Sequence, residues 1–197
     1  TSPFGEPSDQ VLIGIIKDVR VAFLPRHGRF HNIPPNKINY QANIDVLKRI
    51  GVNRIISFSA VGSLREHLHP GDFVLVDQYI DKTNERVNSF FDKGIVAHVG
   101  MADPTCIETN SVITSLSKSS GNEIIPGGTY ITINGPQFST RAESQTYRSW
   151  GADVIGMTNM PEAKLAREAE IRYTTVAMVT DFDCWHPDHE NVDVQMV

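Results

Sequence analysis

Short runs of β-branched and apolar residues recur along the chain and are separated by polar or glycine-containing segments. Residues 11–16 and 20–25 are two such runs, with a gap around Lys17 and Asp18 between them. That gap has the length of a hairpin turn, so the pattern predicts two paired strands. Five later runs have the length and composition of strands, namely residues 54–59, 73–80, 129–133, 153–156 and 173–179.

Segments with helical patterns lie between these runs, at residues 36–50, 105–119, 141–150 and 161–169. In the first, apolar residues recur every four positions, and Gly51 follows as a suitable stop. Thr140 and Glu143 have the spacing of a capping box at the start of the third helix. Pro161 suits the first turn of the fourth helix.

Strands and helices alternate in the second half of the chain. The strand at residues 173–179 is almost wholly apolar or β-branched, as is typical of a sheet that is covered on both faces. The pattern therefore predicts an α/β fold with a mixed central sheet. The sequence contains no internal repeat and no interdomain linker, so we expect one domain over residues 1–197.

Composition and charge narrow the class of protein. The chain has 197 residues, 40% of them hydrophobic and 21% charged, which suits one soluble globular domain. The net charge is −5 and the basic residues are dispersed, so neither nucleic acid nor a membrane is expected as a partner. No apolar run approaches the roughly 20 residues of a membrane span.

The cysteine content and the first residues bear on the compartment. Only Cys106 and Cys184 are present, which favours two thiols in a reducing cytoplasm, although a single bridge between them stays open. The first ten residues are polar and turn-rich and contain no signal peptide. We therefore expect a cytoplasmic protein.

Polar or small residues follow several of the predicted strands, as ligand-binding residues do in open α/β sheets. Arg26 offers a planar fork of donors and His27 a titratable donor, and both suit phosphate. The hydroxyl groups of Ser59 and Thr158 and the amide of Ala60, in a small-residue loop at residues 60–63, would complete an anion cradle. The alternative is that Arg26 and His27 are surface charges and that neighbouring Met157 belongs to the core.

Two carboxyl groups, Asp181 and Asp183, follow the strand at residues 173–179 and flank an aromatic residue. They could hold a ring that carries N–H groups, and burial would raise the pKa of such an Asp and make it a proton donor. The alternative is that Asp181 caps a following helix while Asp183 is solvated.

Other kinds of site have no support in the sequence. The seven histidines follow no metal-binding spacing, and the two cysteines form no paired CxxC pattern, so no metal is expected. The nucleophile elbow GxSxG of serine hydrolases is absent. The segment that begins at Gly127 lacks the dinucleotide fingerprint, and no cofactor is expected.

Taken together and in order, several motifs resemble the trimeric purine nucleoside phosphorylase family, and within it the 5′-methylthioadenosine phosphorylases. The resemblance extends from about residue 3 to about residue 194. It is carried by RHGRFH at residues 26–31, PPNKINYQANI at 34–44, SAVGSL at 59–64, GPQFSTRAES at 135–144, WGADVIGMTNMPEAKLAREA at 150–169 and TDFDCW at 180–185.

The resemblance implies a mixed, partly barrel-like β-sheet flanked by helices, and phosphorolysis of methylthioadenosine to adenine and 5-methylthioribose 1-phosphate. It implies a homotrimer with inorganic phosphate as co-substrate and no cofactor. Phosphate would be held by Arg26, His27, Ser59, Ala60 and Thr158. The nucleoside would be held by Met157 under the ribose, Phe138 and Ser139 at the base, Asp181 and Asp183 at N7 and the 6-amino group, and His98 from an adjacent subunit.

The same resemblance bears on substrate and activity. Asp181, where relatives that use 6-oxopurines carry Asn, favours adenine, and Ser139, where they carry Glu, points the same way. A 6-oxopurine nucleoside or methylthioinosine phosphorylase and an inactive nucleoside-binding domain remain alternatives. The family pattern also has a glycine-rich phosphate-loop strand before this segment and helices after it. We therefore expect a chain truncated at both ends, with weak or no activity.

Overall fold

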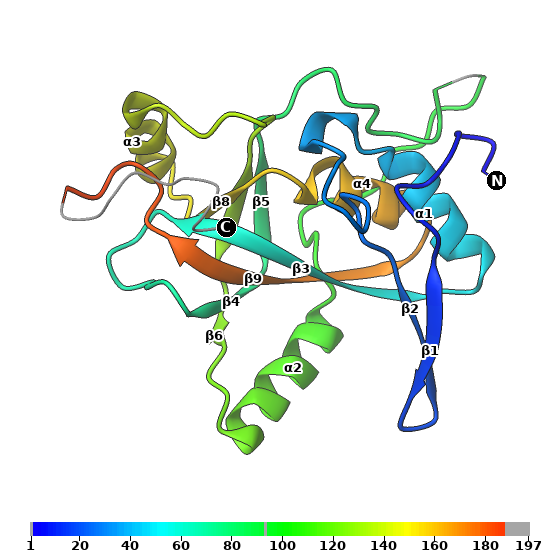
Figure 1. The fold of residues 1–197 in the computed structure, drawn as a ribbon, viewed down its shortest axis with the longest axis horizontal. Helices are drawn as coiled ribbons and strands as arrows, with labels where there is room; N and C mark the ends of the chain where they lie inside the picture. The colour runs from blue at the N-terminus through cyan, green and yellow to red at the C-terminus, as the bar shows by residue number, and fades with distance from the viewer. Residues whose placement is uncertain (1, 93, 188–197) are drawn as a thin grey trace.

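A curled sheet of seven strands forms the centre of this computed structural model, which describes residues 2–92 and 94–187. The strands follow the order β5-β7-β8-β3-β9-β4-β6. In Figure 1, β3 and β9 cross the molecule side by side, at a steep angle to β5 and β8. The strand bounds are β3 (Arg54–Ser63), β4 (Phe73–Val76), β5 (Gln78–Asp81), β6 (Ile125–Pro126), β7 (Thr129–Thr132), β8 (Val154–Gly156) and β9 (Arg172–Asp181).

The sheet is mixed, as the alternation of elements predicted. Strands β3 and β9 are parallel over nearly their whole length, whereas β8 and β4 run antiparallel to them on either side. β7 is parallel to both β5 and β8. The mixed, partly barrel-like sheet that the family resemblance implied is confirmed.

Within these described residues, four α-helices surround the sheet, namely α1 (Tyr40–Arg49), α2 (Ile107–Ser120), α3 (Arg141–Ser149) and α4 (Asn159–Glu168). In Figure 1, α1 and α4 lie together at one end, α3 lies at the other, and α2 projects from the opposite side of the sheet. The predicted capping box of α3 is present: the Thr140 hydroxyl accepts from the Glu143 amide, and the Glu143 carboxylate accepts from the Thr140 amide.

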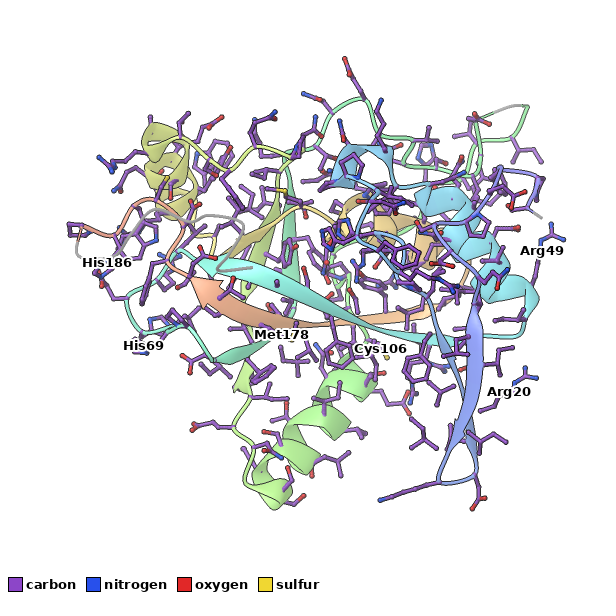
Figure 2. All side chains as sticks on the ribbon, in the orientation of Figure 1. Arg20, Arg49, His69, Cys106, Met178 and His186 are labelled. Atoms are coloured by element: carbon purple, nitrogen blue, oxygen red, sulfur yellow. The ribbon has the colours of Figure 1, made fainter. Side chains whose placement is uncertain are left out.

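A hairpin of β1 (Leu12–Ile16) and β2 (Val19–Phe23) precedes α1, and it confirms the predicted pair of strands. Its turn residues Lys17 and Asp18 both have positive φ, as the tightest hairpin turns require. Arg20 on β2, labelled in Figure 2, donates a hydrogen bond of 2.8 Å to the carbonyl of Ile50 and so ties the hairpin to the end of α1.

Three expectations about element bounds are wrong. The run 73–80 is two strands, because the chain breaks at Asp77 and β4 pairs with β9 while β5 pairs with β7. Residues 60–63 are the end of β3, not a loop, because Gly62 and Ser63 pair with β8. The helix expected from residue 36 starts at Tyr40, where the Asn39 side chain accepts from the Ala42 amide; a short 3-10 turn, Pro35–Lys37, precedes it.

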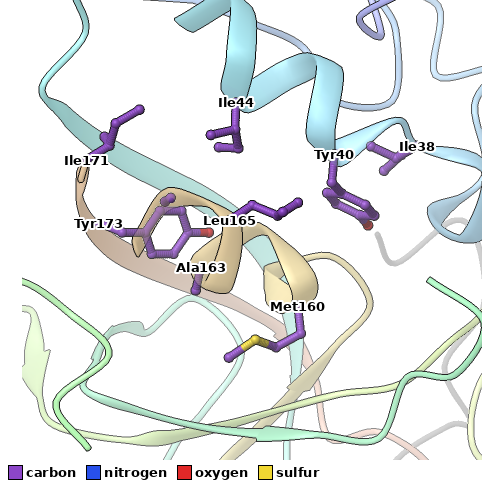
Figure 3. Packing of buried hydrophobic residues seen from close by; sticks show 9 residues of the cluster. Ile38, Tyr40, Ile44, Met160, Ala163, Leu165, Ile171 and Tyr173 are labelled. Carbon is purple, nitrogen blue, oxygen red and sulfur yellow. The ribbon is translucent and has the colours of Figure 1, made fainter. Parts of the chain in front are cut away.

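The largest apolar cluster joins α1 and α4 to the start of β9 (Figure 3). Ile44 is 1% exposed, and Leu165 is fully buried against it. Burying a side chain of this size stabilises the fold by about 1.5–3 kcal/mol. The cluster therefore anchors α4, whose first residues border the site described below. Its members are Ile38, Tyr40, Ile44, Met160, Ala163, Leu165, Ala166, Ile171 and Tyr173.

Two further findings bear on the expected environment. Cys106 and Cys184 are both free thiols, so the bridge that the sequence left open is not formed. Among the residues that the structure describes, no helix combines the length and the apolar character that crossing a bilayer requires.

Candidate functional site

A pocket of about 590 Å³ opens where β3, β7, β8 and β9 end. It brings together ten of the eleven residues that the sequence and the family resemblance singled out. His98 is the exception: it is exposed on the long connection between β5 and α2 and does not line this pocket. The ten are Arg26, His27, Ser59, Ala60, Phe138, Ser139, Met157, Thr158, Asp181 and Asp183.

Arg26 forms the cationic end of the pocket. Its Nη1 donates to the Thr158 hydroxyl at 3.0 Å and lies 3.2 Å from a carboxylate oxygen of Glu162, while its Nη2 donates to the Phe58 carbonyl at 3.1 Å. The side chain is 14% exposed, so the interpretation of Arg26 as a surface charge is wrong. Burial alone would lower the pKa of Arg26, but the Glu162 carboxylate and the phenols of Tyr173, Tyr130 and Tyr40 together outweigh it, and the pKa is raised.

His27 lies beside Arg26 and is held from two sides. Its Nδ1 is 2.8 Å from the Ile33 carbonyl, which requires a hydrogen on that nitrogen, and its ring stacks on His31 at 4.5 Å. Burial lowers the pKa of His27, the bond to Ile33 opposes the shift, and the nearby charges of His31 and Arg26 add to it. The free ring is therefore neutral near pH 7, and an anion in the pocket would favour its protonation.

Two hydroxyl groups extend this cationic end. Ser59 is 7% exposed, and its Oγ lies 3.0 Å from the phenol oxygen of Tyr130. Thr158, at the start of α4, is 6% exposed and accepts from Arg26. The phenol of Tyr130 occupies the space that a side chain at position 156 would need, so Gly156 is required for this packing. Hydroxyl and guanidinium donors thus converge where an anion could bind.

A β-bulge positions Asp181. Val61 pairs with Val179, but Gly62 pairs with Asp181, so Thr180 is the extra residue on β9. The carboxylate of Asp181 accepts from the Thr180 hydroxyl at 2.8 Å and from the Asp183 amide at 2.6 Å. A Cβ at Gly62 would lie 2.9 Å from the Asp181 carboxylate, so only glycine leaves it room. Asp181 is 6% exposed, and no helix begins in residues 182–187, the described residues that follow it, so that alternative is wrong.

Asp183 is the less satisfied of the two carboxyl groups. It is 4% exposed, so the alternative of a solvated Asp183 is also wrong. Its Oδ2 is buried and has no hydrogen-bond partner among the described residues, and the same holds for the hydroxyl of Ser139, which also lines the pocket. Burial raises the pKa of Asp183 to about 6; the Ser144 hydroxyl opposes the shift, and the Asp181 carboxylate adds to it. Unpaired buried groups of this kind are positions where a ligand can bind.

The raised pKa of Asp183 predicts a pH-dependent stability. Its pKa is higher in the folded protein than the usual 3.8, so folding takes up a proton between about pH 4 and 6. The favourable contribution to the free energy of unfolding is present below pH 4. It is lost as the pH rises through 6, and the loss is about 3 kcal/mol. The measurement is urea unfolding at a series of pH values without ligands, in which Asp183→Asn should remove this loss. Replacement of the exposed Asp92 by Asn should leave the loss unchanged. Parallel curves of stability against pH for wild type and Asp183→Asn would contradict the assignment.

The loop between β7 and α3 forms another wall of the pocket. Phe138 in this loop is 39% exposed and lines the pocket. The carbonyl of Ser139 accepts from the Cys184 thiol at 3.2 Å, which ties the loop to the segment after β9. Gly135 has positive φ, and a side chain there would overlap Met157, so this loop packs closely on the end of β8.

Several residues that shape the site were not identified from the sequence. Glu162 is 7% exposed and pairs with Arg26, and Tyr173 donates to it at 2.7 Å. Gly62 leaves space for the Asp181 carboxylate, and the Tyr130 phenol fills the space beside Gly156. Arg86 lies in an irregular segment without a pattern. Only the uncommon position of Glu162 on the buried face of a helix could have indicated a role.

The site has no metal-binding character among the residues described. Within residues 2–92 and 94–187, no group of three or more His, Cys, Asp or Glu side chains is arranged to hold a metal ion. Its polar groups are instead a guanidinium, an imidazole and hydroxyls at one end and two carboxyls at the other.

Comparison with known proteins agrees with this arrangement. The family model described as Phosphorylase superfamily matches residues 1–196. The chain is 57% identical over 197 residues to the S-methyl-5′-thioadenosine phosphorylase of Koribacter versatilis, covering all of this chain and 68% of that protein. It is 59% identical over 196 residues to the enzyme of the same name from Rhodospirillum rubrum, of which it covers 67%. The chain thus spans about two thirds of the length of these relatives.

Solved structures give the same result. Methylthioadenosine phosphorylase from Schistosoma mansoni in complex with adenine superposes with a TM-score of 0.95 at 40% identity, covering 100% of this chain and 75% of that one. A methylthioadenosine phosphorylase from an antarctic soil metagenomic library superposes with a TM-score of 0.94 at 53% identity, covering 98% of this chain and 69% of that one.

Proposed function

Because the chain belongs to the phosphorylase superfamily, we propose that it catalyses the phosphorolysis of 5′-methylthioadenosine to adenine and 5-methylthioribose 1-phosphate. The observation that carries this proposal is one pocket with a buried guanidinium at one end and two buried carboxyl groups at the other. The first suits an anionic nucleophile, and the second suits a leaving group that needs a proton.

Phosphate binds at the cationic end. Arg26 supplies charge and two donor nitrogens, His27 supplies a proton-bearing ring, and Ser59 and Thr158 supply hydroxyls. The amide of Ala60 completes the set. This assignment is supported by the short Arg26–Thr158 distance and by the burial of both hydroxyls. Phosphate is a co-substrate, and no cofactor takes part.

The adenine ring binds between the loop at residues 134–140 and the carboxyl pair. Phe138 contacts the ring, and Ser139 lies at its edge, where its unpaired hydroxyl can form a hydrogen bond. Asp181 faces N7 and Asp183 faces the 6-amino group. Because the two carboxyls interact, we assign the transferred proton to the pair. Asp181 is the member of the pair that passes this proton to N7.

The reaction needs both ends of the pocket at once. A phosphate oxygen bonds to C1′ while the bond from C1′ to N9 breaks, and the electron pair of that bond passes to the purine. Positive charge develops on the ribose, which packs on Met157, and the phosphate dianion stabilises it. Negative charge on the purine is neutralised by a proton added at N7, a contribution of about 10²–10⁴-fold.

Assembly and compartment belong to the same proposal. The chain acts as a homotrimer in which His98 reaches the 5′-alkylthio group in a neighbouring subunit. Its exposure and its position outside its own pocket are compatible with that role. A cytoplasmic location is supported by the two free thiols.

The test is incubation of the intact protein with methylthioadenosine and phosphate, with adenine release followed by chromatography. We expect release that requires phosphate and is at least tenfold faster than hypoxanthine release from methylthioinosine, because Asp183 accepts from an amino group. Reactions without phosphate serve as the control. Absence of phosphate-dependent release would overturn the proposed function, and faster hypoxanthine release would overturn the substrate assignment.

A further inference from the structure

Arg86 contacts both walls of the pocket without lining it. It lies on the long connection between β5 and α2, in a segment without regular structure. Its Nη1 donates to the carbonyls of Met157 at 2.8 Å and Met160 at 2.7 Å. Its Nη2 donates to the carbonyl of Asn134 at 2.7 Å. The same guanidinium therefore binds the chain directly after β8 and the chain directly after β7.

These carbonyls belong to the segments that carry the proposed ligand contacts. Met157 precedes Thr158 and lines the sugar side of the pocket. Asn134 begins the loop that carries Phe138 and Ser139 on the base side. The strands β7 and β8 pair with each other up to Thr132 and Gly156, and beyond that point a side chain that neither wall contains joins the two walls.

The rest of the Arg86 environment holds the guanidinium in one place. Nη1 also donates to the phenol oxygen of Tyr40 at 3.1 Å, and the guanidinium carbon lies 5.5 Å from the centre of that ring. Asn84, two residues earlier, donates from its amide to the Asn134 side chain at 3.1 Å. In the part of the chain that the structure describes, Arg86 binds carbonyl and phenol oxygens and no carboxylate.

Only arginine can form this set of bonds. Its planar fork directs N–H groups from two nitrogens in fixed directions, whereas lysine donates from one atom. Met157 and Asn134 are reached by different nitrogens of Arg86. A lysine at this position would keep the charge but lose the hydrogen bond to one of the two walls.

We propose that Arg86 is a positioning residue that joins the ends of β7 and β8 and thereby sets the spacing between the base-binding loop and the sugar-binding Met157. This inference rests on the proposed function, which assigns those two walls to the nucleoside. Phosphate is held by Arg26, His27, Ser59, Ala60 and Thr158, and Arg86 bonds to none of these residues. Arg86 therefore affects the binding of the nucleoside more than the binding of phosphate.

The test is the Arg86→Lys variant of the intact protein, with separate KM values for methylthioadenosine and phosphate. We expect the nucleoside KM to rise at least fivefold and kcat to fall about tenfold, with the phosphate KM within twofold, because small displacements of substrate-positioning groups are costly. Loss of folded protein alone would lower kcat without changing either KM. An unchanged nucleoside KM, or an equal rise of both KM values, would overturn the inference.

Arg65→Lys is the matched control. Arg65 is also partly buried and joins two segments, through its 2.7 Å bond to Asp153, but it does not line the pocket. Its replacement should change neither KM. If Arg86→Lys does not fold, Tyr40→Phe removes one acceptor of the same guanidinium, and it should raise the nucleoside KM two- to threefold; no rise would count against the role.

A second measurement separates this inference from the proposed function. Calorimetry with adenine alone and with phosphate alone needs no turnover. Weaker adenine binding by Arg86→Lys, by fivefold or more, with unchanged phosphate binding would support the positioning role even if methylthioadenosine were not the substrate. Equal adenine affinity in variant and wild type would overturn it, whatever the turnover assay gave.

Discussion

Replacement of Asp181 by Asn is expected to lower kcat/KM for methylthioadenosine by about 10²- to 10⁴-fold, the usual range for removal of a general acid. Asn has nearly the same shape, and its amide oxygen can still accept from the Asp183 amide, which the Asp181 carboxylate binds at 2.6 Å. The amide cannot donate a proton that leaves with the purine. The loss should therefore appear mainly in kcat, with the fold retained.

The measurement is steady-state kinetics with methylthioadenosine and methylthioinosine across pH 5–9. Asp77→Asn is a suitable control, because Asp77 also accepts from a backbone amide, that of Gly128 at 3.2 Å, but does not line this pocket. A fall of less than threefold in Asp181→Asn would show that the proton comes from elsewhere. Asp183 would then be the first candidate, since burial raises its pKa to about 6.

Replacement of Arg26 by Met should weaken phosphate binding about 100-fold and also destabilise the protein by about 3–5 kcal/mol. The first effect follows from the loss of charge-assisted hydrogen bonds to phosphate. The second follows because Glu162, which is 7% exposed, would keep only the Tyr173 hydroxyl as a partner within the part of the chain that the structure describes. A buried carboxylate that loses its cation is costly. Urea unfolding and phosphate calorimetry measure the two effects separately.

A double variant distinguishes the two roles of Arg26. Adding Glu162→Gln to Arg26→Met removes the uncompensated carboxylate, so most of the stability should return while phosphate binding stays weak. Recovery of phosphate affinity in the double variant would mean that Arg26 only supports the fold. Near-normal phosphate affinity in Arg26→Met would remove Arg26 from the binding site altogether.

Local chemistry made much of the fold predictable. The hairpin follows from two apolar runs around Lys17 and Asp18, and both turn residues have the positive φ that a two-residue hairpin turn requires. The start of α3 follows from the Thr140–Glu143 pair. These features involve hydrogen bonds over a few positions, so a short stretch of sequence contains both partners.

The errors lie where tertiary pairing overrides local pattern. Residues 73–80 look like one strand because the apolar run is nearly continuous, and only pairing with different neighbours breaks it at Asp77. Residues 60–63 look like a loop because they are small, yet two of them pair with β8. Small size at Gly62 instead makes room for the Asp181 carboxylate.

The sequence by itself determined the types of the main elements, the mixed α/β class and the set of polar residues at strand ends, because periodicity and turn chemistry act within a few residues. Only the tertiary structure decided how those residues meet. Arg26 and Thr158 are 132 positions apart. The pairing of Arg26 with Glu162, the bulge at Thr180 and the reach of Arg86 to two strand ends depend on how the whole sheet curls and packs, and no local pattern encodes that arrangement.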